Sequence, residues 1–281
     1  MRGVGYSAPL TYIYTKSDKE VLPMLTVISP AKRLDWTERD TPMTAPSFQD
    51  DAVTLARAAK RLSQQELRRL MDISADLAKL NADRFKAFEV APDDVRPAAL
   101  AFAGDTYTGL EAASLDVDTL AYAQGHLRIL SGLYGLLRPL DGIRPYRLEM
   151  GSRLKTRKGT SLYAYWGPRL AHALSEQAQN VGTETLINCA SVEYFSAVDE
   201  AVLGLQIVTP QFLEDKPDGP KIVSFFAKKA RGAMARFILE RRLTSPDQIL
   251  DFDAGGYVHV PDLSRPGKPA FLRAEAGQVA A

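Results

Sequence analysis

The chain of 281 residues contains one cysteine, which excludes an intrachain disulfide and fits a reducing compartment, so we expect a cytoplasmic protein. No apolar run approaches the ~20 residues that a membrane helix needs, so no membrane partner is expected. Only three histidines occur, His126, His172 and His259, and they lack metal-ligand spacing. The sequence therefore predicts neither a metal site nor a bound cofactor.

Nucleotide-binding motifs are also missing. There is no G-x-x-x-x-G-K, no G-x-G-x-x-G after a strand and no CxxC. Hydrophobic residues make up 46% and charged residues 25% of the chain, as in ordinary globular proteins. Strand and helix patterns alternate without a regular βαβ rhythm. This predicts a mixed α/β (α+β) fold, a mixed sheet surrounded by helices, and not a doubly wound Rossmann fold.

The domain organisation is expected to be simple. An apolar strand pattern begins directly after Met24, whereas residues 1–23 show no such pattern and no signal-peptide core, because Asp18, Lys19 and Glu20 interrupt them. We therefore expect a flexible extension over 1–23, a single domain over 24–273 and a frayed tail over 274–281. We find no internal repeat.

Local patterns predict the individual elements. Ser63 followed by Glu66 is a capping box, and Asp50 or Asp51 is expected to cap the helix before it. Expected helices cover 50–61, 63–71, a segment from Ser74, 116–130, 162–178 and 227–242, with a short helix after Ser245-Pro246. Expected strands cover 25–29, 185–189, 205–208 and 222–226, with a hairpin of 257–260 and 270–273. Residues 37–49 and 131–151 are expected to be irregular.

Positive charge is concentrated although the chain as a whole carries only +1. The segment 221–242 holds seven Lys or Arg against Glu240, and the segment 126–158 holds eight against Asp141 and Glu149. Each segment therefore carries +6 with His neutral. Concentrated cationic segments in a near-neutral protein produce a local field, and phosphates are its natural partners.

The basic helix expected over 227–242 is amphipathic. One arc of its helical wheel holds Lys228, Lys229, Arg231, Arg236 and Arg242. The opposite side holds Ala230, Ala233, Met234 and Phe237. If a strand leads directly into this helix, its first turn carries three cations where the helix dipole disfavours them, which suggests a bound anion. The alternative interpretation is a solvated helix face.

Polar side chains follow four other expected strands or apolar runs, where sites on strand scaffolds usually lie. They are Ser29 and Lys32, Asp105 and Tyr107, Tyr146 with Arg147 and Glu149, and Asn188 with Ser191, Glu193 and Tyr194. The carboxylates among them suit acid–base chemistry if they meet in one cleft. Capping and internal ion pairs, such as Arg147 with Glu149, are the structural alternative. We interpret Cys189 as a buried, inert thiol.

Five motifs together resemble the YaaA family of bacterial peroxide-stress-resistance proteins. They are ISPAK, FAGDTYTGL, HLRILSGLYGLLRPLDGIRPYRLEMG, INCASVEYF and SFFAKKARGAMARFI, in order from Met24 to about Tyr257. The resemblance implies a cytoplasmic protein that limits free iron during peroxide stress. It also implies an unusual α/β fold with a helix-hairpin-helix element and a positively charged cleft that binds DNA.

The helix-hairpin-helix element has two candidates. The first is 67–80, with Asp72, Ile73 and Ser74 as the hairpin, and it departs from the usual pattern because Asp72 and Ser74 replace glycines. The second is the glycine-containing segment 131–135. Such elements bind the phosphate backbone through hairpin N–H groups and favour DNA shape over sequence.

Two functions remain open from the sequence. The first is DNA binding, duplex or distorted, through Lys32, Arg147, Lys228, Lys229, Arg231 and Arg236. The second is an enzyme acting on a nucleotide, nucleic acid or other phosphorylated or sugar substrate, with Asp105, Glu149, Asn188 and Glu193 as candidate catalytic residues. Direct iron sequestration is disfavoured because Cys clusters, His-rich segments and E-x-x-H patterns are missing.

Overall fold

The computed structural model describes residues 23–89 and 93–274, and the statements below concern these residues. The expected extension over 1–23 and tail over 274–281 lie outside the described residues, except for Pro23 and Ala274. The domain boundaries therefore stay predictions.

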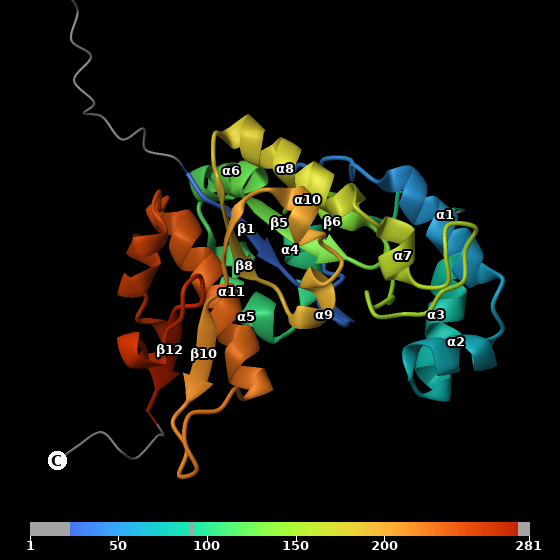
Figure 1. The fold of residues 1–281 in the computed structure, drawn as a ribbon. Coiled ribbons are helices and arrows are strands. Elements are labelled where there is room, and N and C mark those ends of the chain that lie inside the picture. Colours follow the sequence, from blue (N-terminus) through green and yellow to red (C-terminus); the bar gives the residue numbers. More distant parts are fainter. Residues whose placement is uncertain (1–22, 90–92, 275–281) are drawn as a thin grey trace, which may run out of the picture.

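A five-stranded sheet forms the centre of the molecule (Figure 1). Its order is β6 (Gly135–Leu137), β5 (Leu127–Ser131), β1 (Leu25–Ile28), β8 (Thr185–Cys189) and β9 (Gln206–Val208). All neighbours are parallel except β5 and β6, which are antiparallel. The sheet is therefore mixed, and the mixed α+β prediction is confirmed. β1 pairs with β5 on one side and with β8 on the other, so later strands are added on both sides of β1. This makes β1 the topological switch point of the sheet.

Three smaller sheets complete the strands. β10 (Gln211–Glu214) pairs parallel with β12 (Ala270–Arg273), which pairs antiparallel with β11 (Tyr257–His259), as the expected hairpin requires. β2 (Arg33–Leu34) pairs with β4 (Phe102–Ala103), and β3 (Arg96–Pro97) pairs with β7 (Gly142–Ile143). The β2–β4 pair holds the segment after β1 beside the start of α5 (Asp105–Leu110), the helix that follows β4.

Helices surround the central sheet (Figure 1). The α-helices are α1 (Gln49–Lys60), α2 (Gln64–Met71), α3 (Ala75–Ala87), α4 (Ala98–Ala101), α5 (Asp105–Leu110), α6 (Val117–His126), α7 (Leu162–Trp166), α8 (Arg169–Val181), α9 (Val192–Phe195), α10 (Glu200–Leu203) and α11 (Ser224–Arg241). Short 3-10 helices lie at Ala112–Ser114, Pro246–Asp251, Ala254–Gly256 and Pro261–Leu263. In Figure 1 α2 and α3 lie at one end of the molecule, and α11 and the β10–β12 sheet lie toward the other. None of the described helices is both long enough and apolar enough to cross a bilayer.

The expected helix 116–130 is present only over its first part, as α6. Asp116 caps α6 by accepting from the Thr119 N–H at 2.6 Å, but the helix ends at His126 and the next residues form β5. Every residue of β5 is buried beside β1, and this non-local pairing overrides the helical pattern. The expected loop 131–151 likewise contains β6 and β7. The expected helix 162–178 breaks at Gly167-Pro168, where Gly167 adopts φ +50°.

The expected strand 222–226 is also wrong. The nearest bridge, between Glu214 and Lys221, lies just before this segment, and α11 begins already at Ser224. Ile222 and Phe225 are 55% and 56% exposed, so their apolar pattern does not mark a buried strand. The helix therefore does not follow a strand directly.

Helix capping agrees better with the sequence. Ser63 Oγ accepts from the Glu66 N–H, and the Ser63 N–H donates to Glu66 Oε2 at 2.8 Å, so the capping box of α2 is confirmed. Ser74 caps α3 by accepting from the Leu77 N–H. Asp50 and Asp51 are not caps, because α1 begins at Gln49 and both lie within its first turn.

We expect Ser63→Ala to lower the free energy of unfolding by about 1 kcal/mol, because the first-turn N–H groups of α2 lose their acceptor. Gln64→Ala changes an exposed side chain next to the cap and should leave stability within about 0.5 kcal/mol. Urea unfolding of both variants measures the difference. Equal stabilities would contradict a contribution from this capping box.

Candidate functional site

A pocket of about 470 Å³ lies at the carboxyl ends of β1 and β8. Its walls come from the segments after β1, β4 and β8 and from α11. The lining residues are Ser29, Pro30, Ala31, Lys32, Arg33, Ala103, Gly104, Asp105, Thr106, Cys189, Ser191, Val192, Glu193, Tyr194, Lys228 and Arg231. The carboxyl ends of parallel strands beside a switch in chain direction are the usual place for a ligand crevice. Its volume lies within the range of small-ligand pockets.

Hydrogen bonds between chain segments fix the floor of this pocket. The Ser191 N–H donates to Ser29 Oγ at 2.8 Å, and the Ser29 hydroxyl donates to Ser191 Oγ at 3.3 Å. The buried Tyr107 hydroxyl donates to the Ser29 carbonyl at 3.2 Å. These bonds join the ends of β1 and β8 to α5, so the pocket walls are held in a fixed arrangement.

Close packing of α5 on α11 sets the wall that carries Lys228 and Arg231. A Cβ added at Gly232 would lie 1.8 Å from the Thr106 carbonyl oxygen, and one at Gly109 would lie 1.9 Å from the Lys229 carbonyl oxygen. The two helix backbones therefore touch at these glycines. This contact brings Asp105, at the start of α5, to the same pocket as the two cations of α11.

Cations from two parts of the chain surround the pocket. Lys32 and Arg33 come from the segment after β1, and Lys228 and Arg231 come from α11. Together with Asp105 and Glu193 they give the lining a net formal charge of +2. Arg231 is part-buried and makes no ion pair or hydrogen bond with a described residue, and burial lowers the pKa of its guanidinium. An unpaired, partly desolvated cation favours an anionic ligand.

The carboxylates of the site differ in their partners. Asp105 is half-buried and makes no hydrogen bond or ion pair with the described residues, whereas Glu193 Oε1 accepts from the Gly151 N–H at 3.0 Å. Glu149 lines a small side compartment next to the main pocket. Its Oε1 accepts from Arg147 Nε at 3.0 Å, and it lies 2.9 Å from Arg147 Nη2 and 3.4 Å from Lys32 Nζ. The predicted ion pair of Arg147 with Glu149 is confirmed.

Besides Glu149 and the hairpin candidates, four expected site residues do not line the main pocket. Arg147 belongs to the side compartment, and Lys229 faces a second hollow lined by Phe226, Tyr257 and Arg273. Asn188 is buried, where it accepts from the Ala190 N–H at 3.0 Å and supports the turn after β8. Arg236 pairs with Glu111 and Glu240 and donates to the Leu110 carbonyl, so it ties α11 to the end of α5.

The first-turn argument for an anion at the basic helix is wrong. Because α11 begins at Ser224, Lys228, Lys229 and Arg231 lie beyond its first turn. The cationic arc is also narrower than the wheel predicts, since Gly232, Ala235 and Ile238 are buried together with the expected packing face. The site rests on the convergence of separate segments and not on a helix terminus. Arg33 was missed, although it directly follows Lys32 in the SPAKR segment.

The two hairpin candidates differ. Asp72, Ile73 and Ser74 join α2 to α3, with Asp72 in the left-handed region at φ 48° and Ile73 buried. The segment 131–135 instead turns β5 into β6, is buried throughout, and accepts a hydrogen bond from Trp166 Nε1 at the Gly132 carbonyl, so it is not a helix-hairpin-helix. In Figure 1 α2 and α3 lie apart from α9 and α11, which border the pocket.

Cys189 lies on the pocket floor and is 1% exposed, as its apolar strand predicts. Burial raises the pKa of its thiol to about 12, so little thiolate forms at neutral pH. We expect iodoacetamide at pH 8 to leave Cys189 unmodified in the folded protein and to modify it fully in 6 M urea, as measured by intact mass. Rapid modification of the folded protein would contradict this burial.

Fold and pocket define a mixed α+β protein with a polar, cation-lined pocket at the carboxyl ends of parallel strands. The chain belongs to the family described as peroxide stress protein YaaA, whose model matches residues 24–263. It is 82% identical over 258 residues to a UPF0246 protein of Jannaschia sp. strain CCS1, covering 92% of this chain and all of that protein. A UPF0246 protein of Ruegeria pomeroyi is 64% identical over 256 residues, covering 90% of this chain and all of that protein.

Proposed function

We propose that this protein acts in the peroxide stress response by binding DNA at the main pocket, in the cytoplasm and without strong sequence preference. The observation that carries the proposal is the meeting of Lys32, Lys228 and the unpaired Arg231 at one pocket. Phosphate oxygens match guanidinium and ammonium donors. The family description supplies the stress context.

The shape of the pocket favours distorted DNA over a regular duplex. A concave pocket of about 470 Å³ has room for one nucleotide unit, but a stacked and paired base does not enter such a space. Bubbles, frayed ends and mismatches present nucleotides that are already unstacked. We therefore propose that DNA is bound through its backbone, with one unpaired nucleotide at the pocket.

A salt series with a fluorescent duplex and a bubble-containing partner tests this function. Log affinity is expected to fall against log salt with a slope of roughly −3 to −6, because each neutralised phosphate contributes about −0.9 in duplex and about −0.7 in single strands. The bubble is expected to bind more tightly. A flat salt response, or no binding to either DNA, would contradict the proposal.

Lowering of free iron is proposed as an indirect consequence of this role. Among the described residues no three His, Cys, Asp or Glu side chains are grouped to hold a metal ion. We expect equilibrium dialysis to detect no tight ferrous binding. Retention of iron by the folded protein at micromolar concentration would instead support sequestration.

An enzyme acting on a nucleotide or another phosphorylated substrate is the second candidate. The observation that favours it is the position of Asp105 and Glu193 in the same pocket as Arg231, since a carboxylate beside an anion-binding cation suits general acid–base chemistry. Turnover of a nucleotide and nucleoside panel that is lost in Asp105→Asn or Glu193→Gln would support this function. A folded protein that turns over no member of the panel would count against it.

A further inference from the structure

Another cavity of about 400 Å³ lies at the β5–β6 edge of the central sheet. It is separate from the main pocket and from the hollow at Lys229. Its lining comes from the segment before α1, from β5 and β6, and from one side of α8. The lining residues are Ser47, Phe48, Arg128, Leu136, Arg138, Ala173, Glu176, Gln177 and Asn180. No residue lines both this cavity and the main pocket. The proposed DNA-binding function leaves it unexplained.

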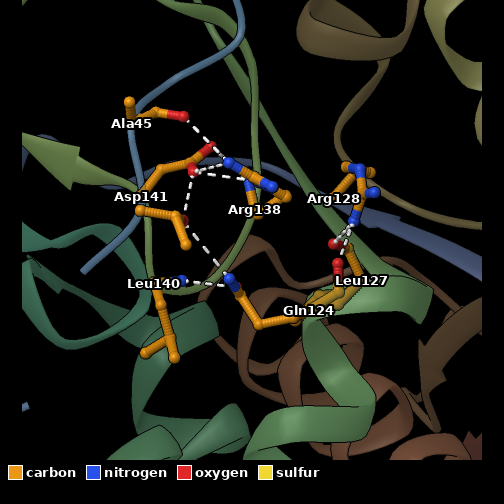
Figure 2. A network of polar contacts seen from close by, with 8 residues as sticks. Ala45, Gln124, Leu127, Arg128, Arg138, Leu140 and Asp141 are labelled. Atoms are coloured by element: carbon orange, nitrogen blue, oxygen red, sulfur yellow. Dashed lines mark hydrogen bonds and ion pairs between the residues drawn. The ribbon is translucent and has the colours of Figure 1, made fainter. Parts of the chain in front are cut away.

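Arg128 is the unusual residue of this cavity, because it is only 5% exposed and has no carboxylate within ion-pair distance among the described residues. Its Nη1 donates to the carbonyls of Gln124 and Leu127, at 2.8 Å each. Figure 2 shows its other guanidinium nitrogens directed away from these carbonyls, and they have no hydrogen-bond partner within 23–89 and 93–274. A largely desolvated guanidinium whose free nitrogens stay accessible and make no direct ion pair with the part of the chain that the structure describes favours an anion from outside the chain.

Arg138 supplies a second cation whose position is fixed. Its Nη2 lies 2.9 Å from Asp141 Oδ1 and donates to the Ala45 carbonyl, as Figure 2 shows. Asp141 is fully buried and also accepts from the Thr44 hydroxyl at 2.6 Å. The Asp141 carboxylate is therefore already held by Arg138 and Thr44. Burial and the charge of Arg138 lower the pKa of Arg128 to about 10, which leaves it charged at neutral pH.

We infer that this cavity binds a small organic oxyanion, a phosphomonoester or a carboxylate, with its charged group at Arg128 and Arg138. Arginine matches both groups with paired N–H donors. The volume exceeds what an inorganic ion needs, and Phe48, Leu136 and Ala173 give the cavity an apolar side for the organic part. The carboxylate of Glu176 also lines the cavity, and because its side chain is exposed, solvent screening lets its charge weaken anion binding without preventing it.

Phenyl phosphate and benzoate are the probes, titrated calorimetrically into a Lys228→Gln/Arg231→Gln background that removes two cations of the main pocket. We expect at least one probe to bind, and the tighter of the two identifies the charged group. Adding Arg128→Met should weaken binding about tenfold or more, since it removes charge-assisted hydrogen bonds. Adding Glu176→Gln should strengthen binding a few-fold, because a repelling charge at the rim is lost.

Absence of binding by both probes, or unchanged affinity in a folded Arg128→Met variant, would overturn the inference. Circular dichroism decides whether that variant is folded. If it is not, Glu176→Gln decides, because its side chain is exposed and its substitution should not disturb folding. An affinity that does not rise in Glu176→Gln would then overturn the site. Neither result depends on whether the main pocket binds DNA.

Discussion

Gly232→Ala is expected to lower the free energy of unfolding by about 3 kcal/mol. The new Cβ would lie 1.8 Å from the Thr106 carbonyl oxygen and 2.8 Å from the Leu110 backbone nitrogen, so α5 and α11 must move apart. Both neighbours are backbone atoms, and no side-chain rotation relieves the clash. Urea unfolding monitored by circular dichroism measures the loss.

Gly125→Ala is the matched control, because it places the same substitution inside another helix, α6. There the nearest atom to the new Cβ is Val181 Cγ1 at 3.7 Å, an ordinary contact. Gly125 lies in the last turn of α6, and replacing a helical glycine by alanine is expected to stabilise the protein by up to about 1 kcal/mol. The two variants should therefore differ in sign. Similar effects in both would contradict the close α5–α11 contact.

Replacing Lys32, Lys228 and Arg231 together by glutamine is expected to weaken binding of bubble DNA about 1,000-fold, if each makes one charge-assisted phosphate contact of about 1.5 kcal/mol. The magnitude of the salt slope should fall by about 2 to 3, depending on how many of the lost contacts are to single strand. Fluorescence anisotropy at several salt concentrations measures both quantities. Glutamine retains hydrogen-bonding capacity and solubility, so the change isolates the positive charge.

The matched control removes three positive charges from exposed positions on α1 and α3, namely Lys60, Lys79 and Lys86. Its total charge equals that of the pocket variant. We expect its affinity for bubble DNA to stay within about threefold of the wild type, because exposed charges away from a contact act only through the screened field. A larger loss in the control than in the pocket variant would move the DNA site toward the α2–α3 hairpin.

Features set by neighbouring residues could be predicted from the sequence. Ser63 with Glu66 and Ser74 with Leu77 form caps over three residues, and β1 and β8 appear as short apolar runs. The boundaries that failed depend on distant partners. β5 is a strand because it pairs with β1, some 100 residues earlier, and α11 begins early because no strand pairs with 222–223 in the structure.

The candidate site shows the same difference between features set by neighbouring residues and features set by distant partners. Polar residues after strands predicted Lys32, Asp105, Ser191 and Glu193 as candidates, and these residues line one pocket because the ends of β1, β4 and β8 meet there. Helical periodicity could not separate Lys228, which faces the pocket, from Lys229, which faces another hollow. That difference is set by the contact of Gly232 with Thr106, two residues far apart in the sequence.

Hydrogen–deuterium exchange with and without bubble DNA tests the central claim, that DNA contacts the main pocket, most directly. Backbone protection is expected in residues 29–33, 104–106, 189–194 and 224–232, which form the pocket walls. Segments 72–74 and 170–181 should show no change. Protection confined to the α2–α3 hairpin, with none at the pocket segments, would contradict the claim.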